Sequence, residues 1–431
     1  MKPRRVTSRL AATALTSALL VTGGAAQAQT APPSTTQSEE QAKPEARSTT
    51  FLDLEAGLGF SSNPFLQFND HSAAFGRISA SGTHQWVSEK GVTAITGYVE
   101  NTTYFSGGYG SKQIFDVGAS THQAASETVS VYGNLNFSGD FAGQLSNRLI
   151  SVPTQPVPLD PSNPLPPTAN YPDLFGLSGR QYRATGNVGA SIRTGSTGTL
   201  SLTAGAQHSW FTGTSSELDY TSYYGSGGYS AQVSERTSVG GTVYLQRQDY
   251  QSGGWANIIN PVATVSTHLS ESLTADAGIG IMAINQHSLG ESDHTLTPSF
   301  SASLCSIGTE SRFCGRISRD AQSALSSNVL NGQRSATINT SIAADYFRRL
   351  SREGTLQASL TAVHYDDAAS LNGNDFQSTY VSGVIGYDRH LGNRIYAGVE
   401  GGVRRLFQTG PDPKLDLNAS VYVRYRLGDL L

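Results

Sequence analysis

Four residues that lie close together in the sequence have side chains able to bind a metal ion. They are His287, Glu291, Asp293 and His294, and imidazole and carboxylate groups are common zinc ligands. The same residue types are more ordinary in a solvated polar loop. Serine and histidine are frequent along the chain, but no spacing sets one pair apart as nucleophile and base. We therefore expect no catalytic residue, no metal and no cofactor.

The first 28 residues have the three parts of a secretory signal peptide. A basic start is followed by an apolar stretch, Leu10 to Val21, and by the small-residue motif that ends at Ala28. We expect cleavage between Ala28 and Gln29. The apolar stretch is too short to span a membrane as a helix. Residues 29–50 are polar and contain three prolines, which predicts a disordered periplasmic linker.

Export determines the expected oxidation state of the two cysteines, Cys305 and Cys314. The periplasm is oxidising, so a disulfide is the expected state of the pair. A zinc site is the weaker alternative, because no histidine lies at ligand spacing beside them.

The composition is unusual for a water-soluble core. Among the 431 residues, 14% are charged and 37% are apolar, and both values are low. Gly, Tyr and Phe are nevertheless abundant, at 46, 19 and 16 residues, which argues against disorder. Such a chain suits strands with one apolar and one polar face. The whole chain has 29 Lys and Arg against 33 Asp and Glu, and removal of the basic leader increases the acidic excess, which argues against a nucleic-acid partner.

From Phe51 onward, apolar and polar residues alternate with a period of two, as in strands whose successive side chains point to opposite faces. The pattern predicts eighteen strands, and the even number would place both chain ends on the periplasmic side. The predicted strands are 51–60, 73–86, 92–105, 113–124, 128–140, 179–193, 198–211, 219–233, 237–249, 257–269, 273–285, 294–306, 313–320, 333–347, 355–366, 376–389, 394–408 and 414–428.

The connections between these strands alternate in length. Short ones contain 88–89, 126–127, 234–235, 270–271 and 351–354, and longer ones are 61–72, 141–178, 286–293, 321–332 and 367–375. Outer-membrane barrels have short periplasmic turns and long outer loops. Residues 51–431 are therefore expected to form a single transmembrane antiparallel up-and-down β-barrel of about 18 strands in the outer membrane of a Gram-negative bacterium. Outer-membrane lipid would surround it, and the barrel-assembly machinery would insert it.

The stretch from Gly59 to Leu66, Gly-Phe-Ser-Ser-Asn-Pro-Phe-Leu, resembles the start of the β-barrel porin family, outer-membrane β-barrel proteins of which some are associated with exopolysaccharide export. The hairpin with Leu304-Cys305 and Phe313-Cys314 has a similar character. The resemblance covers roughly residues 51–431 and implies an outer-membrane barrel with a link to a polysaccharide export system. It implies no catalytic residues. Barrels of this kind usually end in an aromatic residue, whereas this chain ends in Leu431, so Tyr425 or Leu427 would serve instead.

Charged residues of both signs are predicted to face the lumen. They are Asp53, Glu55, Arg77, Arg183, Glu400, Arg404, Arg424 and Arg426. In porins, lumen residues tune selectivity, but mixed signs favour a role in hydrating and bracing the wall. The first and last strands must pair to close the barrel, which would bring Asp53 and Glu55 beside the two arginines of the last strand. Glu400 is expected near Arg424 by hairpin register.

A proline-rich stretch lies within 141–178 and forbids a strand ladder there. Its prolines include Pro153, Pro156, Pro158, Pro161, Pro164, Pro166 and Pro167. It is either a candidate constriction loop folded into the pore or an irregular surface loop.

The expected function is a porin-like channel for passive passage of small solutes or a secreted polysaccharide. The first alternative is a barrel with a blocked lumen and a structural or surface-interaction role. The second is an outer-membrane enzyme, which we disfavour.

Overall fold

The structure is a computed structural model that describes residues 47–64, 66, 71–107, 109–141, 180–212, 219–251, 253–288, 291–322, 336–367, 377–408 and 415–428. The signal peptide and its cleavage site lie outside these residues. Among them, no helix is long and apolar enough to cross a membrane.

Eighteen strands account for nearly all the described residues, which confirms the predicted fold. Their bounds are Arg47–Ser61 (β1), Ala73–Ser88 (β2), Gly91–Tyr104 (β3), Ser111–Ala124 (β4), Val129–Phe141 (β5), Arg180–Thr194 (β6), Gly198–Phe211 (β7), Tyr220–Ser234 (β8), Thr237–Tyr250 (β9), Trp255–His268 (β10), Leu273–Ser288 (β11), Glu291–Ile307 (β12), Ser311–Gln322 (β13), Thr337–Arg349 (β14), Gly354–Asp367 (β15), Gln377–Gly392 (β16), Ile395–Gln408 (β17) and Asp416–Gly428 (β18).

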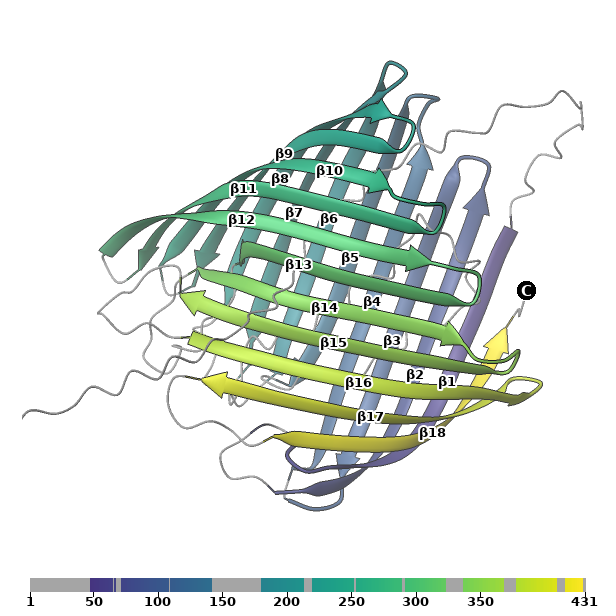
Figure 1. The fold of residues 1–431 in the computed structure, drawn as a ribbon. Helices are drawn as coiled ribbons and strands as arrows, with labels where there is room; N and C mark the ends of the chain where they lie inside the picture. The colour runs from purple at the N-terminus through teal and green to yellow at the C-terminus, as the bar shows by residue number, and fades with distance from the viewer. Residues whose placement is uncertain are drawn as a thin grey trace, which may run out of the picture.

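The strands form one closed antiparallel sheet (Figure 1). Each strand pairs with its neighbours in sequence, and β1 pairs with β18 from Phe51 opposite Gly428 to Ser61 opposite Asn418. We call this β1–β18 pairing the closing seam. Closure leaves no sheet edge at the seam, as a wall in hydrocarbon requires.

The outer face carries the side chains expected of a lipid-facing wall. Leu58, Ile78, Leu135 and Ile279 are 61–70% exposed there, although they are large and apolar. Near the long-loop end, Phe115, Phe137, Tyr182 and Trp210 form a row with neighbouring ring centroids 5.2 to 6.5 Å apart. Near the short-turn end, Trp86, Phe313 and Tyr425 are 41–43% exposed. An apolar band between two aromatic girdles is the outer surface of an outer-membrane barrel.

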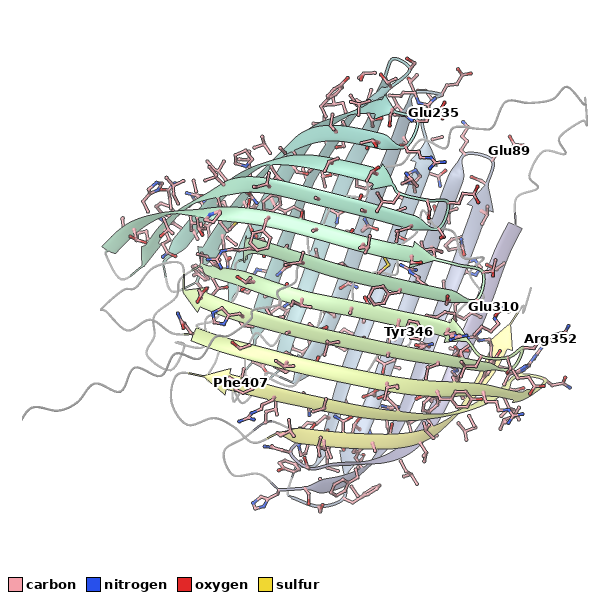
Figure 2. The ribbon with its side chains drawn as sticks, viewed as in Figure 1. Glu89, Glu235, Glu310, Tyr346, Arg352 and Phe407 are labelled. Atoms are coloured by element: carbon pink, nitrogen blue, oxygen red, sulfur yellow. A yellow bond between two sulfur atoms is a disulfide. The ribbon has the colours of Figure 1, made fainter. Side chains whose placement is uncertain are left out.

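The two ends of the barrel differ as predicted. Glu89, Glu235, Glu310 and Arg352 lie in or beside short turns at one end (Figure 2), where the first and last strands also meet. This end is periplasmic by the usual loop asymmetry. The strand ends that the long connections join lie at the opposite, outer end.

Two expectations about bounds are corrected. β1 begins at Arg47, inside the range predicted as linker. The predicted long loop 286–293 is mostly strand, because β11 and β12 stay paired out to Ser288 opposite Glu291. Polar side chains pair across this extension, with His287 Nδ1 2.9 Å from Ser292 Oγ. The polar residues that indicated a loop therefore belong to strands that continue beyond the apolar band.

Candidate functional site: the inner face of the barrel

The eight predicted lumen charges all lie on the inner face, alternating with lipid-facing residues. They are not spread evenly, because most lie on β1, β2, β17 and β18 around the closing seam. Five of them, Asp53, Glu55, Arg77, Arg424 and Arg426, are only 3–6% exposed. Arg183 lies apart on β6, opposite Ser209 of β7.

The closing seam contains a two-bonded ion pair. Asp53 is directly opposite Arg426 in the register. The Arg426 Nε and Nη2 atoms donate to the two carboxylate oxygens of Asp53 at 2.7 and 2.6 Å. Arg–carboxylate pairs with two parallel bonds fix geometry as well as charge, so this pair specifies the register of the seam.

The other two charges at the seam, Glu55 and Arg424, form ion pairs with residues of β2 and β16. Glu55 is opposite Arg424, but it accepts a hydrogen bond from Arg77 Nη2 of β2 at 3.2 Å. Arg77 Nε is also 4.0 Å from Glu100 of β3. Arg424 Nη2 instead contacts Asp388 of β16 at 2.5 Å. We call these residues, together with Asp53 and Arg426, the seam belt.

The expectation for Glu400 was wrong. The β17–β18 register places Glu400 opposite Ser420 and Tyr396 opposite Arg424. The Tyr396 ring lies 5.0 Å from the Arg424 guanidinium carbon and 5.4 Å from that of Arg426. An aromatic ring, and not Glu400, is therefore the β17 neighbour of both arginines, and its face attracts both cations.

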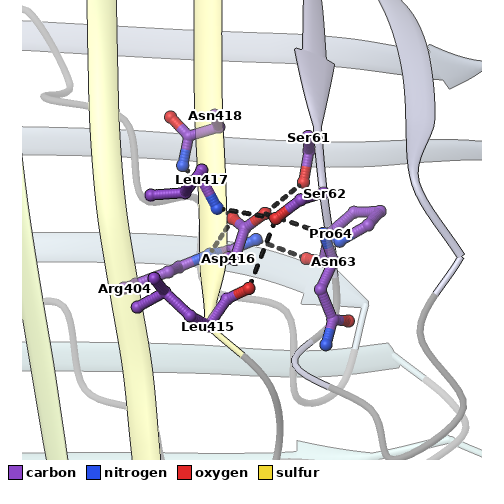
Figure 3. Close-up of polar contacts among 9 residues, drawn as sticks. All are labelled: Ser61, Ser62, Asn63, Pro64, Arg404, Leu415, Asp416, Leu417 and Asn418. Atoms are coloured by element: carbon purple, nitrogen blue, oxygen red, sulfur yellow. Dashed lines mark hydrogen bonds and ion pairs between the residues drawn. The ribbon is translucent and has the colours of Figure 1, made fainter.

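A second polar group closes the outer end of the seam (Figure 3). Asp416 is fully buried and accepts hydrogen bonds from Ser61 Oγ at 2.6 Å, Asn63 N at 2.9 Å and Arg404 Nε at 2.8 Å. Arg404 also donates to the carbonyl oxygen of Pro64 at 2.5 Å. These bonds explain the Ser-Ser-Asn-Pro stretch, because its backbone and hydroxyl groups satisfy a buried carboxylate.

The same stretch turns the chain toward the barrel interior. Leu66 follows it with a positive φ of 51° and is 5% exposed. It packs against Tyr380 and Leu406, which lie on the inner face of β16 and β17. The start of the first outer loop is thus held against the inner wall.

The cysteine pair forms a disulfide between β12 and β13 beside a periplasmic turn. Cys305 and Cys314 are directly opposite in the register, and the turn between the two strands spans only residues 308–310. By contrast, no group of three or more metal-ligating side chains is assembled within the described ranges. His294 contacts the Asn285 side chain instead.

The wall formed by β7, β8 and β9 has a different chemistry from the seam. Gln207 donates to the Tyr220 hydroxyl at 2.8 Å, and Gln246 donates to Ser222 Oγ at 2.8 Å. Gln248 lies directly opposite Ser222. We call this uncharged group of inner-face residues the neutral wall. Its members used below are Gln207, Ser209, Tyr220, Ser222, Tyr224, Gln246, Gln248 and Tyr250. No sequence prediction covers this group, although Tyr244, Gln246, Gln248 and Tyr250 alternate with the lipid-facing residues of β9 and are all uncharged.

The outer end of the β13–β14 hairpin separates from β12, while β14 stays paired with β15. The β12–β13 ladder ends at Phe300 opposite Arg319, whereas β12 continues to Glu291 along β11. By alternation, Ala321 of β13 belongs to the same face as Phe313, which is 43% exposed on the outer surface. Ala321 itself is buried, and its backbone N–H lies 2.9 Å from the sulfur of Met282 on β11.

The contacts of this hairpin place its outer end inside the barrel. Ala321, Ala336 and Ile338 form an apolar cluster with Ala256, Ile258, Met282 and Ile284. The last four alternate with the exposed Ile259 and Ile281, so they are on the inner face of β10 and β11. The Ala336 N–H also donates to Gln286 Oε1 at 2.8 Å. Four consecutive residues, 337–340, are buried, which a strand in the wall with one face to lipid would not show.

We call residues 319–322 and 336–340 the tucked tip. Figure 1 shows β13 ending well short of the outer end of β12. Porin interiors are normally polar, so this apolar inner patch is explained by the strand ends that cover it. The tucked tip narrows the outer half of the lumen. The proline-rich stretch predicted to do this lies outside the described residues, and its role stays a prediction.

Closure, the lipid-facing band and the polar inner face define the class of this protein. It is an 18-stranded, porin-type β-barrel of the Gram-negative outer membrane, with the fold that the resemblance implied.

No protein-family model matches the chain, and no curated protein matches it in sequence. Solved structures with a similar strand layout include OccK2 (OpdF) of Pseudomonas aeruginosa, with 11% identity over 89% of this chain and 98% of that chain and a TM-score of 0.44. OpdK of the same organism, solved with vanillate, has 10% identity over 88% and 99% of the chains and a TM-score of 0.43. The FrpB iron transporter of Neisseria meningitidis has 10% identity over 84% and 62% and a TM-score of 0.45.

Proposed function

We propose that this protein is a porin-like channel for passive passage of small solutes or a secreted polysaccharide. The observation that carries the proposal is the combination of a wide closed wall with a tucked tip in its lumen. Barrels of about 16–18 strands leave an aqueous channel unless something fills it. The tucked tip covers part of that space. Side-chain contacts hold it against β10 and β11, and the β14–β15 ladder, which runs to Thr337 opposite Asp367, joins it to the wall.

The tucked tip is the constriction in this proposal, and two opposing contributions act on its position. In the tucked position it buries seven apolar side chains between two layers. In this position β13 makes no ladder with β12 beyond Phe300, and the buried Oδ1 of Asn339 has no hydrogen-bond partner in the described part of the chain. Apolar burial favours the tucked position, and the unmade hydrogen bonds oppose it.

The seam belt predicts weak ion selectivity. Its charges are of both signs, and most are paired and buried, so little unpaired charge is left to select ions in the lumen. In a salt gradient across a planar bilayer, we expect a reversal potential close to zero.

The first experiment is conductance of the purified, heat-modifiable protein in planar bilayers, with a heat-unfolded sample as control. Discrete current steps support a channel. Assembled protein without current supports the alternative, a blocked-lumen barrel with a structural or surface-interaction role, which the tucked tip would also suit. An assay of lipid and peptide hydrolysis tests the second alternative, an outer-membrane enzyme. A link to polysaccharide export is tested by co-purification with an export system in the native host.

A further inference from the structure

The neutral wall contains buried polar groups that nothing in the described part of the chain satisfies. Gln248 is 0% exposed, and both its amide nitrogen and its amide oxygen lack a hydrogen-bond partner. Ser209 Oγ, also 0% exposed, lacks one as well. Buried polar side chains are nearly always hydrogen-bonded, so these groups indicate a missing partner.

The missing partner must be able both to donate and to accept. The Gln248 amide offers two N–H donors and a carbonyl acceptor, and the Ser209 hydroxyl can do either. Alcohol hydroxyl groups meet this requirement. A carboxylate can only accept and an ammonium group can only donate, so neither satisfies both ends of the amide.

Aromatic rings lie next to the unpaired groups. Tyr220 and Tyr250 are directly opposite each other, with ring centroids 6.4 Å apart, and Tyr220 is directly opposite Ser209. Rings beside convergent polar groups are the usual composition of a small-molecule site. Their faces suit the C–H face of a sugar ring. The charge that borders this group is Arg183, directly opposite Ser209, and the residues around Gln248 on the neutral wall give a carboxylate no counter-charge there.

The unpaired groups also border the tucked tip. Gln248 is opposite Ala256, which is opposite Gln286, and Gln286 accepts the bond from Ala336 of the tip. Further from the rim, the side chains of Gln207, Tyr224 and Gln246 are only partly buried. A ligand that follows the neutral wall outward therefore meets Gln248 where the tip begins.

We propose that the neutral wall is a binding site for an uncharged saccharide. Sugar hydroxyl groups bond to Gln248 and Ser209, and the ring packs on the neighbouring tyrosines. This inference rests on the proposed channel, because it names the class of solute that the constriction meets.

Direct binding tests the site without requiring a current. The full mature protein is kept in a detergent without a sugar head group and titrated calorimetrically with maltohexaose, or with an anionic oligogalacturonate of equal length. We expect maltohexaose to bind and the anionic ligand to bind at least about tenfold more weakly. Gln248→Leu, which removes two neutral hydrogen bonds, should weaken maltohexaose binding about tenfold. Ser209→Ala should weaken it less.

The matched control is Gln357→Leu, the same change on the inner face of β15, and it should leave binding unchanged. Heat modifiability of each variant shows that it is folded. Equal binding of both ligands, no binding of maltohexaose, or an unaltered affinity in folded Gln248→Leu would overturn the proposal and leave the amide to water alone. Binding in a protein that passes no current would refute the channel and not the site.

Discussion

The closing seam and the neutral wall are two regions of one inner face, and both bury polar groups. At the seam, Asp53 and Arg426 satisfy each other with two bonds, and Asp416 is the acceptor of several donors. On the neutral wall, Gln248 and Ser209 are buried with no partner among the described residues. The difference separates polar groups that hold the barrel together from polar groups that are available to a ligand.

This contrast predicts opposite effects on stability. Removing one member of a paired buried charge leaves the other uncompensated, which is strongly destabilising. Replacing an unpaired buried amide by an apolar group of similar shape removes a desolvation cost and is neutral or stabilising.

Arg426→Glu should nearly abolish assembly. It places a second carboxylate beside Asp53 in a buried setting, and loss of such a pair costs about 3–5 kcal/mol before repulsion is counted. The measurement is the fraction of heat-modifiable barrel in membranes. Adding Asp53→Arg should restore part of it. The control, Arg389→Glu, alters an exposed pair with Glu353 and should cost less than about 1 kcal/mol. A seam variant that assembles as well as this control would refute the bracing role.

Asp416→Ala should lower the free energy of unfolding by about 3 kcal/mol, because Arg404 loses its carboxylate in a buried place. Chemical denaturation of the folded barrel in micelles measures this. Asp249→Ala breaks an exposed pair with Arg247 at the outer rim and is the matched control. Equal midpoints for the two variants would show that the outer seam group does not stabilise the barrel.

Replacing both Cys305 and Cys314 by Ser should cost at most about 2–3 kcal/mol, since the disulfide closes only a short loop. The barrel should still assemble, because the β12–β13 ladder around the turn is unchanged. Thiol labelling of the unreduced wild-type protein should find no free thiol. Two labelled cysteines would contradict the disulfide.

Gln248→Leu should raise the free energy of unfolding slightly, by roughly 0–1 kcal/mol. It is the one substitution in this series expected to stabilise the barrel while weakening a ligand. A clear loss of stability would mean that the amide already has a structural partner, and the contrast between the two regions would disappear.

The strands were predictable because alternating apolar and polar residues are compatible with a strand and not with a helix. The short turns with Ser-Glu indicated where one strand ends and the next begins. Seam charges such as Asp53 and Arg426 followed from closure alone. The position of Glu400 did not, because hairpin register depends on the connection between β17 and β18, which the charge pattern does not encode.

The tucked tip was also missed, although the sequence carried a signal. From Ile281 to Ile284 the residues Ile-Met-Ala-Ile are apolar on both faces of the strand, whereas a wall strand beside a wet lumen needs only one apolar face. Because Met282 and Ile284 face the lumen, another apolar segment has to pack against them inside the barrel. The segment that packs there makes a long-range contact, and the periodicity of a sequence does not identify such contacts.

Single-channel recording of a cross-linked tip tests most directly whether the tucked tip is the constriction. Ala321→Cys and Met282→Cys, in a background with both native cysteines replaced by Ser, are joined by oxidation or by a short thiol-reactive cross-linker across their observed contact. The account predicts two current levels for the unlinked protein, only the lower level after linking, and return of the upper level on reversal. Identical current levels in the linked and unlinked protein would contradict it.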